Sequence, residues 1–156
     1  MLNKLIPTLI LAAVSATAAA ADVTYTKDIA PIFKESCSEC HGAESPLFKE
    51  FKKEEKRYTK EKTGPRMDSY ALLISHVGWP ETGAIMRRLD DGKASPGGKP
   101  GNMYRYLGGD DAGRQKNLAI IKAWVGEGAW NLNRFEVRGD VPAITKEQLD
   151  KLQLKY

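Results

Sequence analysis

Apolar residues in this chain recur at helical spacing, and no stretch alternates between apolar and polar positions as a half-buried strand would. The strongest pattern follows Asp110 and Asp111, which suit a helix N-terminus because the helix dipole is positive there. Gly126 or Gly128 would end this helix. We therefore predict a long amphipathic helix whose buried face is formed by Leu118, Ile121, Trp124 and Val125.

Three shorter stretches, residues 25–36, 67–77 and 82–89, have the same periodicity. Asp68 or Ser69 is the expected N-cap of the second, because a side-chain oxygen there can accept a hydrogen bond from a free backbone N–H. The expected inward-facing residues are Ile29, Ile32 and Phe33 in the first stretch, Tyr70, Leu73, Ile74 and Val77 in the second, and Ile85, Met86 and Leu89 in the third.

Residues 47–62 are dominated by charges of both signs at helical spacing, which predicts a solvated helix with Phe48, Phe51 and Tyr58 facing inward. We interpret this segment as a surface insertion, and the alternative is a docking face for a partner protein. Near the C-terminus, Thr145 and Gln148 form a capping-box pattern that starts a short helix. All of these elements are helical, so the sequence predicts an all-α domain.

The N-terminus has the pattern of an export signal. Lys4 supplies the positive region, residues 5–14 are apolar, and residues 16–21 offer small-residue cleavage sites, with the cut expected after Ala20 or Ala21. The alternative is an uncleaved membrane anchor, but the uncharged run is short for a span. We therefore predict a signal peptide over residues 1–21 and an exported, periplasmic protein without stable membrane insertion after cleavage.

Composition excludes little by itself. The chain has 156 residues, enough for one domain, and a formal charge of +4. Lysines and arginines do not cluster with aromatic residues, so we do not expect a nucleic-acid partner. We find no glycine-rich phosphate-binding loop, no nucleophile elbow and no internal repeat.

The chemistry is concentrated at Cys37, Cys40 and His41, which spell C-x-x-C-H. This is the signature of covalent c-type haem attachment: each thiol adds to one haem vinyl group, and the histidine serves as the proximal iron ligand. A redox disulfide would need a βαβ context that the sequence lacks. A structural zinc site would need four ligands, and there is no second cysteine pair. The sequence therefore predicts one covalent haem c.

The phrase from Tyr25 to Gly42, a helix ending in C-x-x-C-H-G, resembles the class I monohaem c-type cytochromes of the bacterial periplasm. This resemblance implies a cytochrome c-like helical domain over residues 22–129, in which the first and last helices cross beside the haem. Residues 130–156 exceed the family core and are expected to pack on it as a C-terminal extension. The resemblance also implies that a proline carbonyl accepts a hydrogen bond from the proximal histidine, with Pro65 as first candidate and Pro46 as second.

The family's sixth iron ligand is a methionine on an irregular loop before the last helix, and the resemblance assigns this role to Met103. Met86 is the second candidate and Met67 the third, since methionines at helical spacing are more often core residues. His76 would instead give two histidine ligands. An open or water-bound sixth position is the remaining alternative.

These features predict a periplasmic cytochrome c that carries single electrons between redox proteins and is not itself an enzyme. The first alternative is a small haem enzyme, or the haem subunit of an oxidoreductase, that binds small ligands at an open sixth position. The second is a subunit docked permanently on an oxidoreductase through the charged insertion and the C-terminal extension. The sequence identifies neither the electron donor nor the acceptor.

Overall fold

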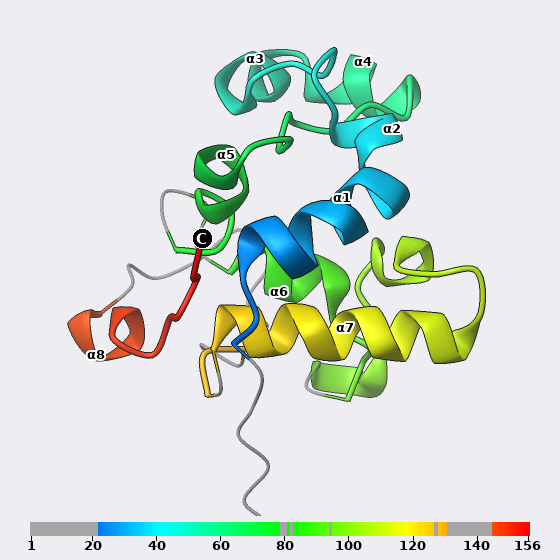
Figure 1. Ribbon diagram of the computed structural model, residues 1–156. Helices are drawn as coiled ribbons and strands as arrows, with labels where there is room; N and C mark the ends of the chain where they lie inside the picture. The colour runs from blue at the N-terminus through cyan, green and yellow to red at the C-terminus, as the bar shows by residue number, and fades with distance from the viewer. Residues whose placement is uncertain (1–21, 79–80, 82, 94, 127, 131–144) are drawn as a thin grey trace, which may run out of the picture.

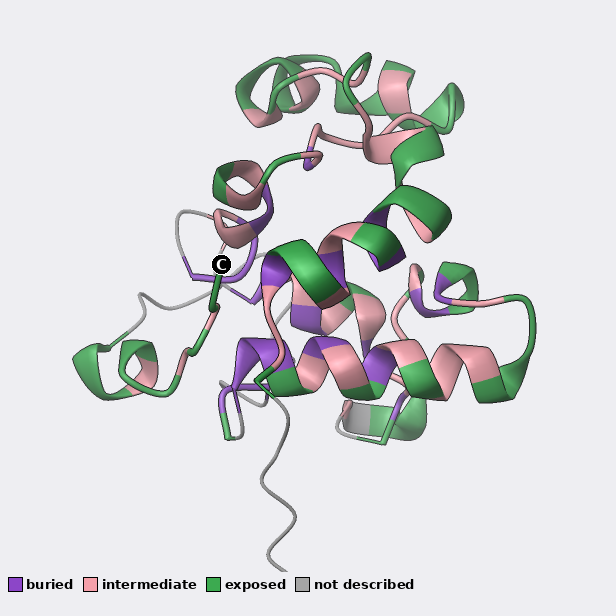
Figure 2. Ribbon diagram, viewed as in Figure 1, coloured by how far each residue is buried: buried purple, intermediate pink, exposed green. Residues whose placement is uncertain are grey.

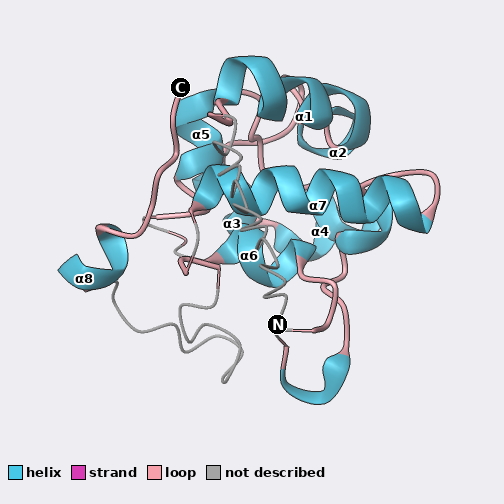
Figure 3. Ribbon diagram, turned by 60° about the horizontal axis from the view of Figure 1, so that its bottom comes forward, coloured by secondary structure: helices cyan, strands magenta, loops and turns pink. Residues whose placement is uncertain are grey.

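The computed structural model describes residues 22–78, 81, 83–93, 95–126, 128–130 and 145–156. Within these residues every regular element is a helix, as predicted (Figure 3). The elements in chain order are η1 (Tyr25–Ile29), α1 (Ala30–Ser36), α2 (Ser38–His41), α3 (Phe48–Lys53), α4 (Glu55–Lys60), α5 (Tyr70–Ile74), α6 (Ala84–Leu89), η2 (Pro96–Gly98), η3 (Tyr104–Tyr106), α7 (Asp111–Val125) and α8 (Lys146–Leu149).

Helix α7 is the longest element and forms as predicted. The side chain of Asp110 caps it by accepting a hydrogen bond from the backbone N–H of Gly113 at 2.7 Å. Gly126 ends it with φ of +117°, a conformation that a residue with a Cβ rarely adopts. The predicted face is buried, with exposed fractions from 0% to 6% for Leu118, Ile121, Trp124 and Val125.

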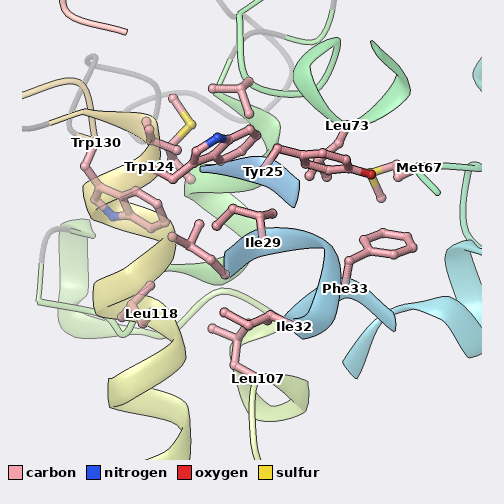
Figure 4. Packing of buried hydrophobic residues seen from close by; sticks show 14 of the residues in the cluster. Tyr25, Ile29, Ile32, Phe33, Met67, Leu73, Leu107, Leu118, Trp124 and Trp130 are labelled. Atoms are coloured by element: carbon pink, nitrogen blue, oxygen red, sulfur yellow. The ribbon is translucent and has the colours of Figure 1, made fainter. Parts of the chain in front are cut away.

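The N-terminal segment packs against α7 through its predicted apolar face. It begins as one π-helical turn, η1, which contacts α7 and continues into α1 (Figure 1). Ile29, Ile32 and Phe33 are buried in the same cluster as Leu118 and Trp124 (Figure 4). Burying each of these side chains stabilises the fold by roughly 1.5–3 kcal/mol. This packing therefore holds the N-terminal segment against α7.

Two of the short helices are shorter than the sequence predicts. Only Tyr70–Ile74 of the predicted helix 67–77 is helical, because the Ser69 side chain accepts a hydrogen bond from the Leu72 N–H and starts the helix there. Asp68, the other candidate cap, pairs with Arg66 instead. Helix α6 begins at Ala84, after Gly83 in the left-handed conformation.

The charged segment forms two helices, α3 and α4, where one was predicted. Glu54 interrupts it with φ of −128° and ψ of 35°, outside the helical range. The residues of α3 and α4 are exposed or half-buried (Figure 2), and Arg57 pairs with Glu54 within the segment. Phe48 faces inward as predicted, with its ring 5.4 Å from that of His76, whereas Phe51 stacks on Tyr58.

The last residues of the chain cover the end of α7. The capping box of Thr145 and Gln148 is formed, but α8 ends at Leu149, which remains half exposed. The chain then returns to α7, where the Leu154 N–H donates to the Trp124 carbonyl at 3.0 Å and the Lys155 carbonyl accepts from the Trp124 indole N–H at 2.9 Å. No helix in the described residues is long and apolar enough to span a membrane. The predicted signal peptide, residues 1–21, lies outside the described residues.

Candidate functional site

Helices α1 and α2 hold the two cysteines and the histidine of the motif on successive turns. Cys37 joins the two helices, and its carbonyl accepts hydrogen bonds from the N–H of Cys40 at 3.2 Å and of His41 at 3.0 Å. These bonds form one tight turn, so the two sulfur atoms and the imidazole have fixed starting points close together.

Cys37 and Cys40 are both partly buried and are not joined in a disulfide. Burial, together with the neighbouring Cys40, raises the pKa of the Cys37 thiol to about 11. The described residues bring no cluster of three or more metal-binding side chains together.

The His41 ring is fixed by the loop that follows the charged helices. Its Nδ1 lies 2.7 Å from the Pro65 carbonyl oxygen. A carbonyl can only accept, so Nδ1 carries the proton and Nε2 keeps its lone pair. Of the two candidate prolines, Pro65 is therefore the partner, and the Pro46 carbonyl accepts from the Arg66 N–H instead.

Gly64 lies directly against the imidazole of His41. A Cβ on Gly64 would collide with Cε1 and Nδ1 of that ring, so the close approach requires glycine. Backbone hydrogen bonds hold the loop in place, from the Gly64 N–H to the Cys40 carbonyl at 2.8 Å and from the Met67 N–H to the His41 carbonyl at 2.9 Å. Burial lowers the pKa of His41, which keeps the imidazole neutral and able to bind a metal ion.

Met103 lies half-buried on the irregular loop just before η3. Its N–H donates to the Arg88 carbonyl of α6 at 3.0 Å, and the Gly101 N–H donates to the Asp90 carbonyl at 2.8 Å. The loop is therefore paired along the C-terminal end of α6. Met86 and Met67 belong to the hydrophobic core, with exposed fractions of 0% and 8%, and Met67 lies near Leu73 and Phe33 (Figure 4).

His76, the other histidine, is buried with 5% of its surface exposed. Its Nδ1 lies 3.0 Å from the Leu72 carbonyl oxygen, an arrangement like that of His41 and Pro65. Among the described residues, its Nε2 is the one buried side-chain nitrogen or oxygen without a hydrogen-bond partner. Burial lowers the pKa of His76. Its charge would also lower the pKa of His41, so the two imidazoles lie within electrostatic range of each other.

The residues of the motif fit a covalent haem. The two cysteines start from one turn, and the neighbouring imidazole is anchored through Nδ1 with its Nε2 lone pair available. Gly64 has no Cβ, which allows the loop backbone to lie directly against this ring. When bound, the haem supplies an iron that cycles between ferric and ferrous states.

Comparison with known proteins agrees with this fit. The family model described as PccH cytochrome c matches residues 24–156. The chain belongs to the PccH cytochrome c family. A solved structure, the monohaem cytochrome PccH from Geobacter sulfurreducens, is 50% identical, with a TM-score of 0.74, and the match covers 86% of this chain and 98% of that chain. No curated protein matches the sequence.

Family membership confirms the resemblance drawn from the motif. The protein is a monohaem cytochrome c with an all-helical, cytochrome c-like fold, and its one haem c is held covalently through Cys37 and Cys40. The family is one of electron carriers. Sequence reasoning missed two features of the surroundings, the contact of Gly64 with the His41 ring and the burial of Asp90. A glycine before proline, and an aspartate in a helix-closing turn, give no local sign of either role.

Proposed function

We propose that this cytochrome is an exported, periplasmic carrier of single electrons whose haem iron is bound by His41 on one side and Met103 on the other. The hydrogen bond from His41 Nδ1 to the Pro65 carbonyl carries the proposal, because it leaves Nε2 as the free ligand atom beside the two attachment thiols. In this proposal residues 1–21 are the signal peptide, residues 22–129 the haem domain and residues 130–156 an extension packed on it.

Two observations favour Met103 over Met86 and Met67 for the sixth position. It lies on an irregular loop, half-buried, whereas Met86 and Met67 are packed in the hydrophobic core. Its backbone is paired to α6, so the loop has a fixed place. A thioether is a soft, neutral ligand that favours ferrous iron and so raises the reduction potential.

Filling the sixth position determines the kind of chemistry. An iron with two protein ligands has no site for a substrate, and its coordination stays the same in both oxidation states. The cytochrome would then exchange electrons with a donor and an acceptor protein in transient complexes. An open sixth position would instead allow small ligands to bind, as the alternative of a haem enzyme or enzyme subunit requires.

The ligand assignment is tested with Met103→Ala, Met86→Ala and His76→Ala, each read by the absorption spectrum of the ferric holoprotein. We expect Met103→Ala alone to lose the weak sulfur-to-iron band at the red end and to become high-spin. Met67→Leu is the matched control in the core. Loss of the band in Met86→Ala with its retention in Met103→Ala would reassign the ligand, and a wild-type spectrum without the band would contradict methionine ligation.

A further inference from the structure

We propose that Asp90 and Trp130 together act as positioning residues for Met103 and thereby set the strength of its bond to the haem iron. The inference rests on the proposed function, since it takes Met103 as the sixth ligand. It assigns to the C-terminal extension, which begins with Trp130, a role at the haem that its sequence does not indicate.

Asp90 is fully buried and connects three parts of the chain. Its Oδ1 accepts a hydrogen bond from the Trp130 indole N–H at 3.0 Å, and its Oδ2 accepts from the Gly92 N–H at 2.8 Å. Its backbone carbonyl accepts from the Gly101 N–H at 2.8 Å. One residue thus binds both ends of the loop 92–101 and the start of the extension. A buried carboxylate depends on such bonds because losing one leaves an acceptor that water cannot reach.

The connection from Asp90 to Met103 is short. Gly101 is two residues before Met103, and a Cβ on Gly101 would collide with the carbonyl oxygens of Arg87 and Arg88, so the loop lies directly against α6. The Met103 N–H then donates to the Arg88 carbonyl at 3.0 Å. A shift of the Asp90 backbone therefore reaches Met103 through the Gly101 hydrogen bond and the two residues that follow, while the Arg88 bond ties Met103 itself to α6.

A separate set of contacts holds Tyr104, the residue after Met103. The Gln115 side chain of α7 donates to the Tyr104 hydroxyl at 2.8 Å and to Asp91 Oδ2 at 3.2 Å. Tyr104 follows Met103 directly and is buried. These contacts keep the loop folded when the Trp130 bond is removed, so a change at Trp130 loosens the methionine without unfolding its surroundings.

Trp130 is suited to this role because its ring is fixed in place and its indole N–H is a hydrogen-bond donor. Only 6% of its surface is exposed, and the Lys122 ammonium lies 5.1 Å from its ring centre. The position of the ring fixes the direction of the indole N–H, which donates its hydrogen bond to Oδ1 of Asp90. Phenylalanine at this position keeps an aromatic ring and removes the donor.

The test is Trp130→Phe in the exported holoprotein, with Trp124→Phe as the matched control. Trp124 is also buried and also donates its indole N–H, but to the Lys155 carbonyl of the C-terminal segment and not to Asp90. Ferric protein is titrated with imidazole, which displaces a weak methionine ligand, and loss of the sulfur-to-iron band is followed. We expect Trp130→Phe to bind imidazole about tenfold more tightly than wild type, equivalent to about 1.4 kcal/mol. We expect Trp124→Phe to lower the melting temperature and leave imidazole affinity unchanged.

Asp90→Asn is the second variant, which keeps the shape of the side chain but replaces one acceptor oxygen with a donor. It should also bind imidazole more tightly than wild type. Wild-type imidazole affinity in either Trp130→Phe or Asp90→Asn would overturn the inference, as would an equal increase in Trp124→Phe. If Met103→Ala retains the sulfur-to-iron band, the proposed function fails and this inference fails with it. If Met103→Ala loses the band and Trp130→Phe behaves as wild type, only this inference fails.

Discussion

The Pro65 carbonyl oxygen lies 2.7 Å from Nδ1 of His41 and fixes the imidazole beside the two attachment cysteines. This contact joins segments separated by the whole charged segment, α3 and α4. A hydrogen bond to a carbonyl makes the opposite ring nitrogen a stronger ligand and fixes the ring orientation. The backbone before and after the charged segment is therefore held together at His41.

Replacing Gly64 with alanine should disturb this contact most selectively. The added Cβ would collide with the His41 ring, so the ring must tilt away from the Pro65 carbonyl. Losing such a supporting contact typically weakens metal binding by roughly 10–100-fold. We expect Gly64→Ala to yield much less low-spin holoprotein, measured by the Soret peak per polypeptide. Gly109→Ala is the control, since a Cβ there meets nothing within 4 Å. Equal holoprotein yields from the two variants would contradict the role of Gly64.

Removing the cap of α7 should lower stability without changing the haem spectrum. The Asp110 side chain accepts from the Gly113 N–H at 2.7 Å, and such caps contribute about 1 kcal/mol. Asp110→Ala should therefore lower the free energy of unfolding by about that amount in denaturant titrations. Asp111→Ala is the control, because that side chain is exposed and its contacts are long, at 3.4 Å to Arg114 and 3.5 Å to the Tyr104 hydroxyl. Similar losses in both variants would mean that charge, and not the cap, stabilises this terminus.

His76 should make stability depend on pH. Burial lowers its pKa below the value of 6.5 that it has in the unfolded chain. Between these two pKa values the imidazole is protonated in the unfolded state and neutral in the folded state. The free energy of unfolding therefore falls as the pH drops through about 6.5 toward the folded pKa. The loss amounts to about 1.4 kcal/mol for each unit by which the pKa is lowered. Denaturant titrations at several pH values should show this fall.

The comparison that isolates His76 is His76→Leu against Ala71→Ser, an exposed position of the same helix. The leucine variant has no titrating group, so its stability should fall less between pH 7 and the acid range than that of wild type. The serine variant keeps the imidazole and should keep the wild-type slope. Identical slopes in wild type and His76→Leu would show that the buried imidazole is not the group responsible.

Export predicts a defined N-terminus. Full-length protein expressed in a bacterium with a cytochrome c maturation system should appear in the periplasm, with the chain beginning at Ala21 or Asp22. Mass spectrometry of the purified protein measures this directly. Recovery of the intact chain from the membrane fraction would instead support the anchor alternative.

Much of this fold can be predicted from the sequence where signals are local. The α7 face and its Asp110 cap lie within one continuous stretch, and the attachment motif is readable from Cys37 to His41. The ends of helices are harder to predict, because two neighbouring residues can each be a suitable N-cap. At the start of α5, Asp68 pairs with Arg66 and leaves the cap to Ser69.

Features that depend on distant residues could not be read in this way. Asp90 and Trp130 are 40 residues apart, and nothing near either one marks the other as its partner. The helix break at Glu54 comes from a non-helical backbone conformation, which the charged residues around it do not predict. The same applies to His76, whose unpartnered Nε2 is visible only once burial is known.

Carbon monoxide binding to the reduced, exported holoprotein tests the proposed electron carrier most directly. If His41 and Met103 both bind the iron, the ferrous absorption spectrum should stay low-spin and unchanged when carbon monoxide is added. A high-spin resting haem whose Soret peak shifts at once on addition of the gas would contradict the proposal and favour a ligand-binding haem enzyme.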